Sequence, residues 1–148
     1  MRSIFHNRMK PELVAPCGMN CNVCSGYLAY SHHLPKKRGK IHHCEGCLPG
    51  EKNCAFLKRR CAKIGDRRIR FCFECDGFPC ERLETLDARY RKKYGVSLIG
   101  NLREIKESGI NDFLVRQKKA FKCDRCDGVV SIHNGKCYRC DKIESWKG

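Results

Sequence analysis

The sequence predicts a small metal-stabilised α+β protein with three parts: a cysteine-rich N-terminal domain of irregular structure built on zinc knuckles, a set of short helices, and a C-terminal zinc-ribbon β-hairpin. Only 32 of the 148 residues are Leu, Ile, Val or Phe, which is close to the level at which chains remain disordered. Fourteen residues are cysteines, and a chain with so small an apolar core needs metal ions or covalent links to fold. Ten of these cysteines form C-x2-C pairs, a spacing that directs two sulfurs at one ion.

The N-terminal domain is expected over residues 15–80, which hold ten cysteines. Two four-thiolate sites would leave two thiols over, whereas three four-ligand sites would need two histidines. His42 and His43 are the nearest histidines to a cysteine, although solvent-exposed or hydrogen-bonded roles suit them as well. Spacing leaves the pairing open. It also leaves the metal open, because the first three cysteines read C-x3-C-x2-C and thiolates accept either zinc or an iron–sulfur cluster.

A helical connector is expected over residues 81–121, which contain no cysteine. Apolar residues at helical spacing predict one buried face on each of three helices; these are Leu83, Leu86 and Tyr90, then Leu98, Ile99, Leu102 and Ile105, then Phe113, Leu114 and Phe121. Ser97 is expected to cap the start of the second helix and Asn111 that of the third, with Gly109 just past the end of the second. We expect these helices to dock the ribbon onto the N-terminal domain.

The ribbon is expected over residues 122–142, where two C-x2-C pairs are separated by ten residues. Asn134-Gly135 between them is a strong signal for a two-residue hairpin turn. A site closed by four thiolates is usually structural, because no coordination position remains for a substrate. Altogether we expect about three zinc ions, with an iron–sulfur cluster as the alternative at the N-terminal cysteines. The candidate ligands are all fourteen cysteines: Cys17, Cys21, Cys24, Cys44, Cys47, Cys54, Cys61, Cys72, Cys75, Cys80, Cys123, Cys126, Cys137 and Cys140.

The chain also resembles a family of bacteria and archaea, an uncharacterised cysteine-rich domain of unknown function that is presumed to bind zinc. The motifs that carry the resemblance are Ala15-Pro16-Cys17-Gly18-x-x-Cys21-x-x-Cys24, Cys44-Glu45-Gly46-Cys47, Phe78-Pro79-Cys80 and, in the ribbon, His133-Asn134-Gly135-Lys136-Cys137-Tyr138. The first ribbon pair reads Cys123-Asp124-Arg125-Cys126-Asp127-Gly128, where relatives usually have a proline after the first cysteine and two glycines after the second. The resemblance implies metal sites and no mechanism.

Positive charge is concentrated in one stretch of the chain. The net charge is +15, and about +9 remains if three four-thiolate zinc sites each contribute −2. Residues 36–70 carry +9 of the uncorrected total, among cysteines that would hold them on a fixed surface. Such a surface favours phosphate contacts. The candidate contacts are Lys36, Lys37, Arg38, Lys40, Lys58, Arg59, Arg60, Lys63, Arg67, Arg68 and Arg70.

We therefore expect a cytoplasmic, non-enzymatic, zinc-binding protein whose partner is structured RNA or a ribonucleoprotein. The alternatives are an iron–sulfur or thiol redox protein, and an adaptor whose zinc ribbon contacts another protein. Catalytic motifs of the Ser/His/Asp, phosphate-loop and H-E-x-x-H types do not occur in the sequence. Apolar runs long enough to span a membrane do not occur either, and the first residues lack the apolar stretch of a secretion signal.

Overall fold

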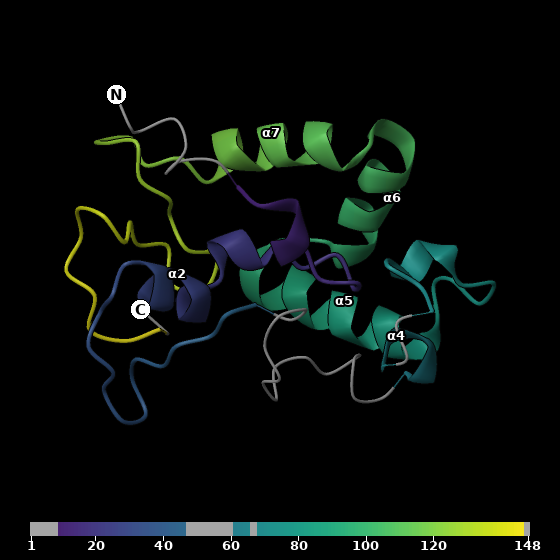
Figure 1. Ribbon diagram of the computed structural model, residues 1–148, viewed down its shortest axis with the longest axis horizontal. Coiled ribbons are helices and arrows are strands. Elements are labelled where there is room, and N and C mark those ends of the chain that lie inside the picture. The colour runs from purple at the N-terminus through teal and green to yellow at the C-terminus, as the bar shows by residue number, and fades with distance from the viewer. Residues whose placement is uncertain (1–8, 47–60, 66–67, 147–148) are drawn as a thin grey trace.

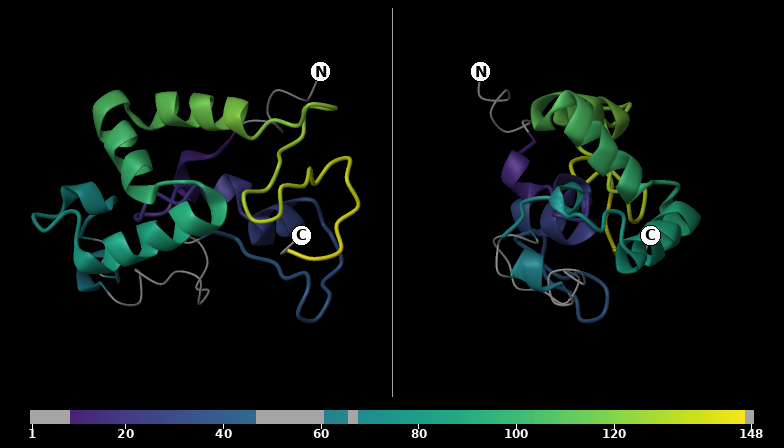
Figure 2. Two further views of the ribbon diagram at one scale, coloured as in Figure 1. Left: turned by 180° about the vertical axis from the view of Figure 1, so that it is seen from behind. Right: turned by 90° about the vertical axis from the view of Figure 1, so that its right-hand side faces the viewer.

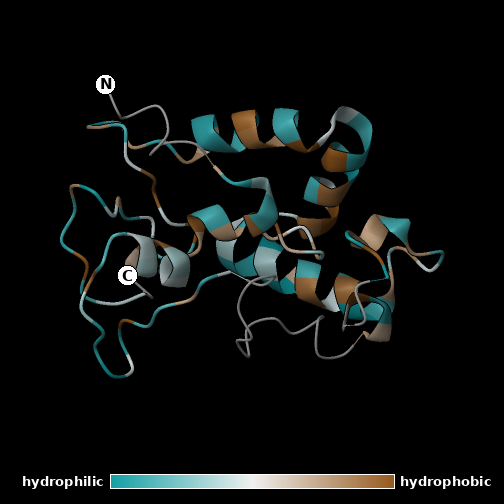
Figure 3. Ribbon diagram, in the orientation of Figure 1, coloured by the Kyte–Doolittle hydropathy of each residue, from teal (hydrophilic) through white to brown (hydrophobic). Residues whose placement is uncertain are grey.

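Three helices form three sides of an open frame in the computed structural model, which describes residues 9–46, 61–65 and 68–146. They are α5 (Glu81–Tyr94), α6 (Leu98–Ser108) and α7 (Ile110–Ala120), and Figures 1 and 2 show α7 and α5 as opposite sides joined by α6. The remaining elements are short: η1 (Pro11–Leu13), η2 (Cys21–Val23), α2 (Ser25–Ser31), α4 (Ala62–Gly65) and η3 (Cys72–Glu74). Figure 3 shows apolar residues recurring along α6 and α7, as expected for helices with one buried face.

The corner between α5 and α6 is built on Asp87, whose side chain is only 5% exposed. Its carboxylate accepts hydrogen bonds from the Ser97 hydroxyl, the Ile99 amide and the Arg91 guanidinium, at 2.8–2.9 Å. Ser97 caps α6 by accepting a hydrogen bond from the Gly100 amide, as predicted. Burial raises the pKa of Asp87, but the three hydrogen bonds and the charge of Arg91 outweigh burial and hold that pKa below its ordinary value.

The corner between α6 and α7 is a single residue, Gly109, at φ 89°. It ends α6 as predicted, and it is also the residue that precedes α7, which has no side-chain cap. The prediction that Asn111 caps the third helix was wrong, because α7 begins at Ile110 and includes Asn111. With only one residue between the two helices, no room remains for a separate capping turn.

The N-terminal segment, residues 9–20, lies inside this frame (Figure 2). The main core joins Val14 of this segment to Leu83, Leu102 and Phe113 of the three helices, and all four side chains are fully buried. Gly18, at φ 92°, lies so close to α6 that a Cβ there would come within 2.5 Å of the Leu98 carbonyl oxygen. The helices therefore enclose the first cysteine motif.

The C-terminal segment, which we define as residues 121–146, contains no strand, and neither does the rest of the described chain. The expected β-hairpin is reduced to isolated bridges between Lys122 and Val129 and between Val130 and Cys137. The Gly135 amide donates to the Ser131 carbonyl and the Ser131 amide to the Lys136 carbonyl, so a wider turn replaces the predicted two-residue hairpin.

This segment docks on the N-terminal part of the chain directly, and not only through the helices as expected. The Ile132 amide donates to the Val23 carbonyl at 3.0 Å, and Tyr138 packs in a small core with Leu28 and Ile41. The two parts therefore share buried surface. No helix among the described residues is long and apolar enough to cross a membrane.

Candidate metal centre

The four cysteines of the C-terminal segment converge on one point. The Sγ atoms of Cys123, Cys126, Cys137 and Cys140 all lie within 4.8 Å of one another. Two of these distances are 3.7 Å (Cys123 to Cys140) and 3.6 Å (Cys126 to Cys137). Four sulfurs placed tetrahedrally at about 2.3 Å from an ion would be about 3.8 Å apart. The cluster therefore has the size and donor set of a four-thiolate site for a metal such as zinc or iron.

Backbone amides support the thiolates of this cluster. The amides of Arg125, Gly128 and Arg139 donate to the sulfurs of Cys123, Cys126 and Cys137 at 3.2–3.4 Å. The Arg125 amide makes the largest contribution to lowering the pKa of Cys123 to about 6. Burial, followed by the neighbouring thiols, raises the pKa of Cys140 to about 12. Cys123 therefore ionises more readily than Cys140, and a bound cation favours the thiolate form of its ligands.

Asp141 and Gly128 complete the surroundings of the cluster. Asp141 accepts hydrogen bonds from the Cys137 amide at 2.8 Å and the Arg125 guanidinium at 2.6 Å, so it joins the two C-x2-C turns. A Cβ on Gly128 would lie 2.7 Å from the Cys137 sulfur and 3.1 Å from the Cys126 sulfur. Glycine is required at this position by lack of space and not by backbone conformation, because Gly128 does not have a positive φ.

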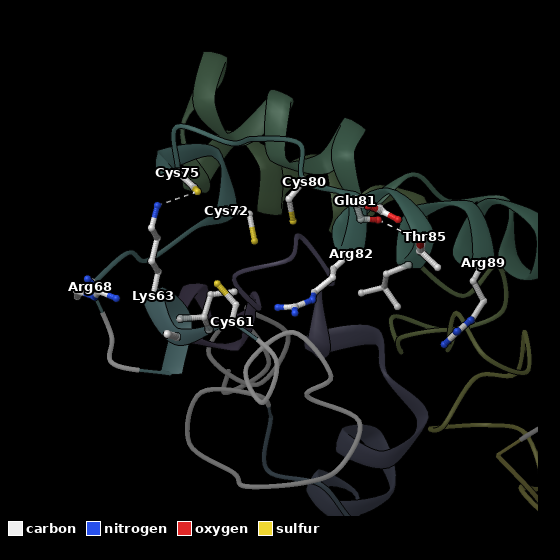
Figure 4. A pocket seen from close by; sticks show the side chains of 13 residues that line it. Cys61, Lys63, Arg68, Cys72, Cys75, Cys80, Glu81, Arg82, Thr85 and Arg89 are labelled. Carbon is white, nitrogen blue, oxygen red and sulfur yellow. Dashed lines mark hydrogen bonds between the residues drawn. The ribbon is translucent and has the colours of Figure 1, made fainter.

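A second group of thiols surrounds a cavity of about 860 Å³. Cys72 is the first residue of η3 and Cys75 follows its end, while Cys61 precedes α4 and Cys80 precedes α5. Figure 4 shows their sulfurs around a common space. Burial and then the neighbouring thiols, Cys17 among them, raise the pKa of Cys72 to about 12. These sulfurs are more widely separated than those of the C-terminal segment. In the described chain, only the C-terminal group brings three or more candidate ligands within 4.8 Å of one another.

Basic side chains line the same cavity. The Lys63 ammonium lies 3.3 Å from the Cys75 sulfur, and it acts with the Gly77 amide, whose contribution is larger, to lower the pKa of Cys75. Arg68, Arg82 and Arg89 also line the cavity, where the single acidic lining residue described is Glu81. Part of the positive charge in this region therefore compensates sulfur charge.

The three cysteines of the first cysteine motif lie near Tyr90. Burial, and then the negative charge of Cys17, Cys24 and Cys21, raises the pKa of Tyr90, which places the three sulfurs close to this hydroxyl group. The same turn occurs at residues 21–24 and at residues 72–75. In each, the amide of the second cysteine donates a hydrogen bond to the carbonyl of the first cysteine at 3.1 Å. Two similar knuckles thus flank Cys17.

The histidines near Cys44 have neighbours other than a metal site. His43 Nε2 is hydrogen-bonded to the Leu34 carbonyl at 2.7 Å. The rings of His42 and Trp146 make a T-shaped contact, with their centres 6.2 Å apart. The Cys44 sulfur accepts a hydrogen bond from the Gly46 amide. Its predicted pair partner Cys47, and Cys54 as well, lie outside the described residues.

The structure divides the predicted phosphate-binding residues between two ends of the molecule. Lys36, Lys37, Arg38 and Lys40 are exposed on a turn that is closed by the bridge from Lys37 to Ile41; we call these four residues the basic turn. Lys63 and Arg68 lie by the cysteine-lined cavity, at the α4 end of Figure 1. Lys58, Arg59, Arg60 and Arg67 lie outside the described residues.

Arg70 is engaged inside the protein. Its guanidinium donates to the Pro11 carbonyl at 3.0 Å and stacks 4.1 Å from the centre of the Phe71 ring. Phe71 stacks in turn on Phe73, so these two aromatic rings pack against each other. The pair does not stand ready to stack on bases.

Sequence patterns gave no signal for a second cavity of about 420 Å³, on the far side of Leu86 and Arg89 from the first. Its walls come from four separate parts of the chain, and of its aromatic residues only His133 belongs to a motif identified in the sequence. Trp146 is the only tryptophan of the chain, and it lines this cavity. A single tryptophan near the end of a polar chain was the nearest thing to a sequence signal for the cavity.

The comparison with protein families gives one match. No curated protein and no solved structure matches the chain. The matched region begins at Leu13 and ends within α5, so it includes the first cysteine motif and the four cysteines that line the larger cavity. The C-terminal four-cysteine cluster lies outside it. Residues 13–85 are similar to the family described as "Protein of unknown function (DUF3795)".

Proposed function

We propose that the protein is a non-enzymatic, zinc-stapled binding protein, and that the C-terminal cluster holds a structural zinc ion. The observation that carries this proposal is the convergence of four sulfurs within 4.8 Å of one another. A single ion fits this spacing, whereas an iron–sulfur cluster places its own irons and sulfides between the thiolates and spreads them further apart. Four thiolates also fill the coordination sphere of zinc, which suits a structural role.

The N-terminal cysteines supply the remaining metal capacity in this proposal. Their ten thiols suffice for two further four-ligand sites, which gives about three ions per chain. Lys63 and the arginines that line the cavity offset the negative charge of thiolate-bound metal. The wider separation of these sulfurs leaves an iron–sulfur cluster as the alternative at this position.

Metal analysis of anaerobically purified protein tests the metal proposal. We expect a colourless protein with about three zinc ions per chain. Cys126→Ser should lower the zinc content by one ion. A brown protein that contains iron and sulfide would replace this proposal with the redox alternative, and an unchanged zinc content in Cys126→Ser would exclude the C-terminal cluster as a site.

We further propose that the basic turn binds phosphates of structured RNA or of a ribonucleoprotein. Its four cationic side chains are exposed, and none forms an ion pair with another described residue. Ile41 at the end of the turn packs on Tyr138, and the Trp146 amide donates to the Lys40 carbonyl at 2.8 Å. The metal-bound C-terminal segment would therefore hold the basic turn in place for phosphate contacts.

Binding of a structured RNA at several salt concentrations tests this second proposal. The test variant reverses the charges of the basic turn with Lys36→Glu, Lys37→Glu, Arg38→Glu and Lys40→Glu. The control makes the same charge change at exposed residues of α6 and α7 with Arg103→Glu, Lys106→Glu, Lys118→Glu and Lys119→Glu.

We expect the test variant to lose RNA affinity by at least about tenfold more than the control, and the salt dependence to become less steep. An equal loss in both variants would mean that net charge alone acts, and would overturn the assignment of the surface. A partner that is captured after nuclease treatment would favour the protein-adaptor alternative.

A further inference from the structure

The cavity of about 420 Å³ lies beside the C-terminal half of α5, where four separate parts of the chain meet. α5 contributes Tyr90 and Tyr94, the turn before Cys44 contributes His42, the C-terminal segment contributes His133 and Trp146, and the start of α2 with the residue before it contributes residues 24–26. The volume is within the usual range of small-molecule sites. None of the lining residues belongs to the basic turn, and Cys24 is the one candidate thiolate ligand among those described.

Aromatic rings form much of the wall, and they meet at steep angles. The ring centres of Tyr94 and His133 are 5.1 Å apart with an interplanar angle of 89°. Those of His133 and Trp146 are 5.9 Å apart at 79°, and those of Tyr90 and Tyr94 are 5.2 Å apart at 56°. Rings that meet edge to face fix one another's orientation without stacking face on face. Such a wall offers surface for a planar ligand.

Hydrogen bonds hold the wall in position before any ligand binds. The Ser25 amide donates to His133 Nδ1 at 3.1 Å, which fixes the orientation of that ring. The backbone of Trp146 is held at both polar atoms, because its amide donates to the Lys40 carbonyl and its carbonyl accepts from the Ser25 hydroxyl. A pre-formed wall reduces the entropy lost on binding.

Two cationic side chains on α5 line the same cavity. Arg89 and Lys93 are four positions apart on α5 and therefore lie on one face of the helix. Both are exposed. No carboxylate is found among the described residues that line this cavity, and Arg91, which pairs with Asp87, is not one of them. The site therefore combines aromatic surface with positive charge that no carboxylate of the described lining balances.

We propose that this cavity binds a nucleoside phosphate, with the base against the aromatic wall and the phosphate at Arg89 and Lys93. Bases stack on aromatic side chains, and guanidinium and ammonium groups make charge-assisted hydrogen bonds to phosphate. A ligand without a ring would leave the aromatic wall unused, and a neutral ligand would leave the two cations unpaired. The proposal does not rest on RNA binding, because the basic turn shares no side chain with this cavity.

Trp146 fluorescence provides the test, because this residue is the only tryptophan in the chain. The metal-loaded protein is titrated with AMP, adenosine, ribose 5-phosphate and inorganic phosphate, and the AMP result is checked by equilibrium dialysis. We expect AMP to give a saturable change and each of the other three compounds to bind at least about tenfold more weakly.

Arg89→Gln and Lys93→Gln should each weaken AMP binding by about tenfold, the effect of losing one charge-assisted hydrogen bond to phosphate. Tyr94→Leu should weaken it to a similar degree. Lys92→Gln is the matched control, because Lys92 is also exposed on α5 but does not line the cavity, and it should leave the affinity unchanged.

Three results would overturn the proposal: no binding of AMP by the metal-loaded protein, equal affinity for phosphate and AMP, or an equal loss of affinity in Arg89→Gln and Lys92→Gln. Neither Gln variant alters the basic turn, so RNA binding measured on the same variants tests the RNA proposal separately.

Discussion

Ser25 and Ser131 are 106 positions apart in the sequence, and their hydroxyl oxygens share a buried hydrogen bond of 2.6 Å. Ser25 lies in the matched domain, next to Cys24, and Ser131 lies in the C-terminal segment. The bond from the Ile132 amide to the Val23 carbonyl lies alongside. The two cysteine-containing parts of the chain are therefore joined by direct polar contacts as well as by apolar packing.

Removal of either hydroxyl should destabilise this joint. We expect Ser25→Ala and Ser131→Ala each to lower the free energy of unfolding by about 0.5–1.5 kcal/mol, because the buried bond between the two hydroxyls is lost. In each variant the remaining hydroxyl keeps one other partner: the Ser25 hydroxyl keeps the Trp146 carbonyl, and the Ser131 hydroxyl keeps the His133 amide. The double variant should lose clearly less than the sum of the two single variants. Urea unfolding of the metal-loaded proteins measures this. Ser31→Ala, at an exposed position, is the control and should change stability by less than about 0.5 kcal/mol. Strictly additive effects would contradict a direct interaction.

Gly128→Ala should weaken metal binding at the C-terminal cluster. Its added methyl group would lie 2.7 Å from the Cys137 sulfur, so the sulfurs must move away from tetrahedral positions. We expect the zinc affinity of this site to fall by at least about tenfold, as measured by competition with a chromogenic chelator. Gly77→Ala is the matched control, because Gly77 also follows a C-x2-C turn but its nearest atom would be 3.9 Å away. Equal affinities in the two variants would show that the close contact is relieved without cost.

Cys137→Ser should release the C-terminal segment while α5, α6 and α7 remain folded. Cys137 is fully buried, and a serine hydroxyl is a poor ligand for zinc. We expect one zinc ion fewer per chain, faster proteolysis between residues 121 and 146, and altered Trp146 fluorescence. Helical circular dichroism should change little, because the helices are packed mainly on the N-terminal segment. Complete loss of the helical signal would instead mean that this metal site supports the whole fold.

Asp87→Asn should reduce stability in a pH-dependent way. The pKa of Asp87 is lowered in the folded protein, so its charge contributes stability above the ordinary carboxyl value near pH 4, and this contribution is lost as the pH falls through the folded value. We expect a loss of about 1–3 kcal/mol at pH 7, and a smaller difference from the wild type at pH 3–4. Comparative urea unfolding at several pH values measures it. Glu107→Gln, at an exposed position of α6, should show neither effect.

Local patterns were enough to predict the helices and one cap. Ser97 was identified from its place before an apolar helical pattern, and the structure confirms it. Asn111 is also a residue type that caps helices and also precedes an apolar helical pattern. However, Gly109 is the only residue between α6 and α7, so the capping position is Gly109 and Asn111 lies inside α7. Capping signals identify residues able to cap, whereas the length of the connection decides which residue does so.

Contacts between distant residues explain the expectations that the structure changed. Lys63 and Arg70 looked like surface cations in the sequence, but Cys75 and the Pro11 carbonyl hold them. The aromatic cavity was not predicted because Tyr94 and Trp146 come together only in the folded chain. The convergence of the C-terminal sulfurs was predictable, since C-x2-C pairs ten residues apart have few other ways to fold.

α5 runs from Glu81 to Tyr94, whereas the matched domain stops at residue 85. Excision at that boundary would cut the helix after five residues and remove Asp87. It would also strip α6 and α7 from Val14 and Leu83, which share the main core with Leu102 and Phe113. The matched region is thus not an autonomous folding unit in this chain, and a recombinant fragment of residues 13–85 should be insoluble or unfolded even when it is supplied with zinc.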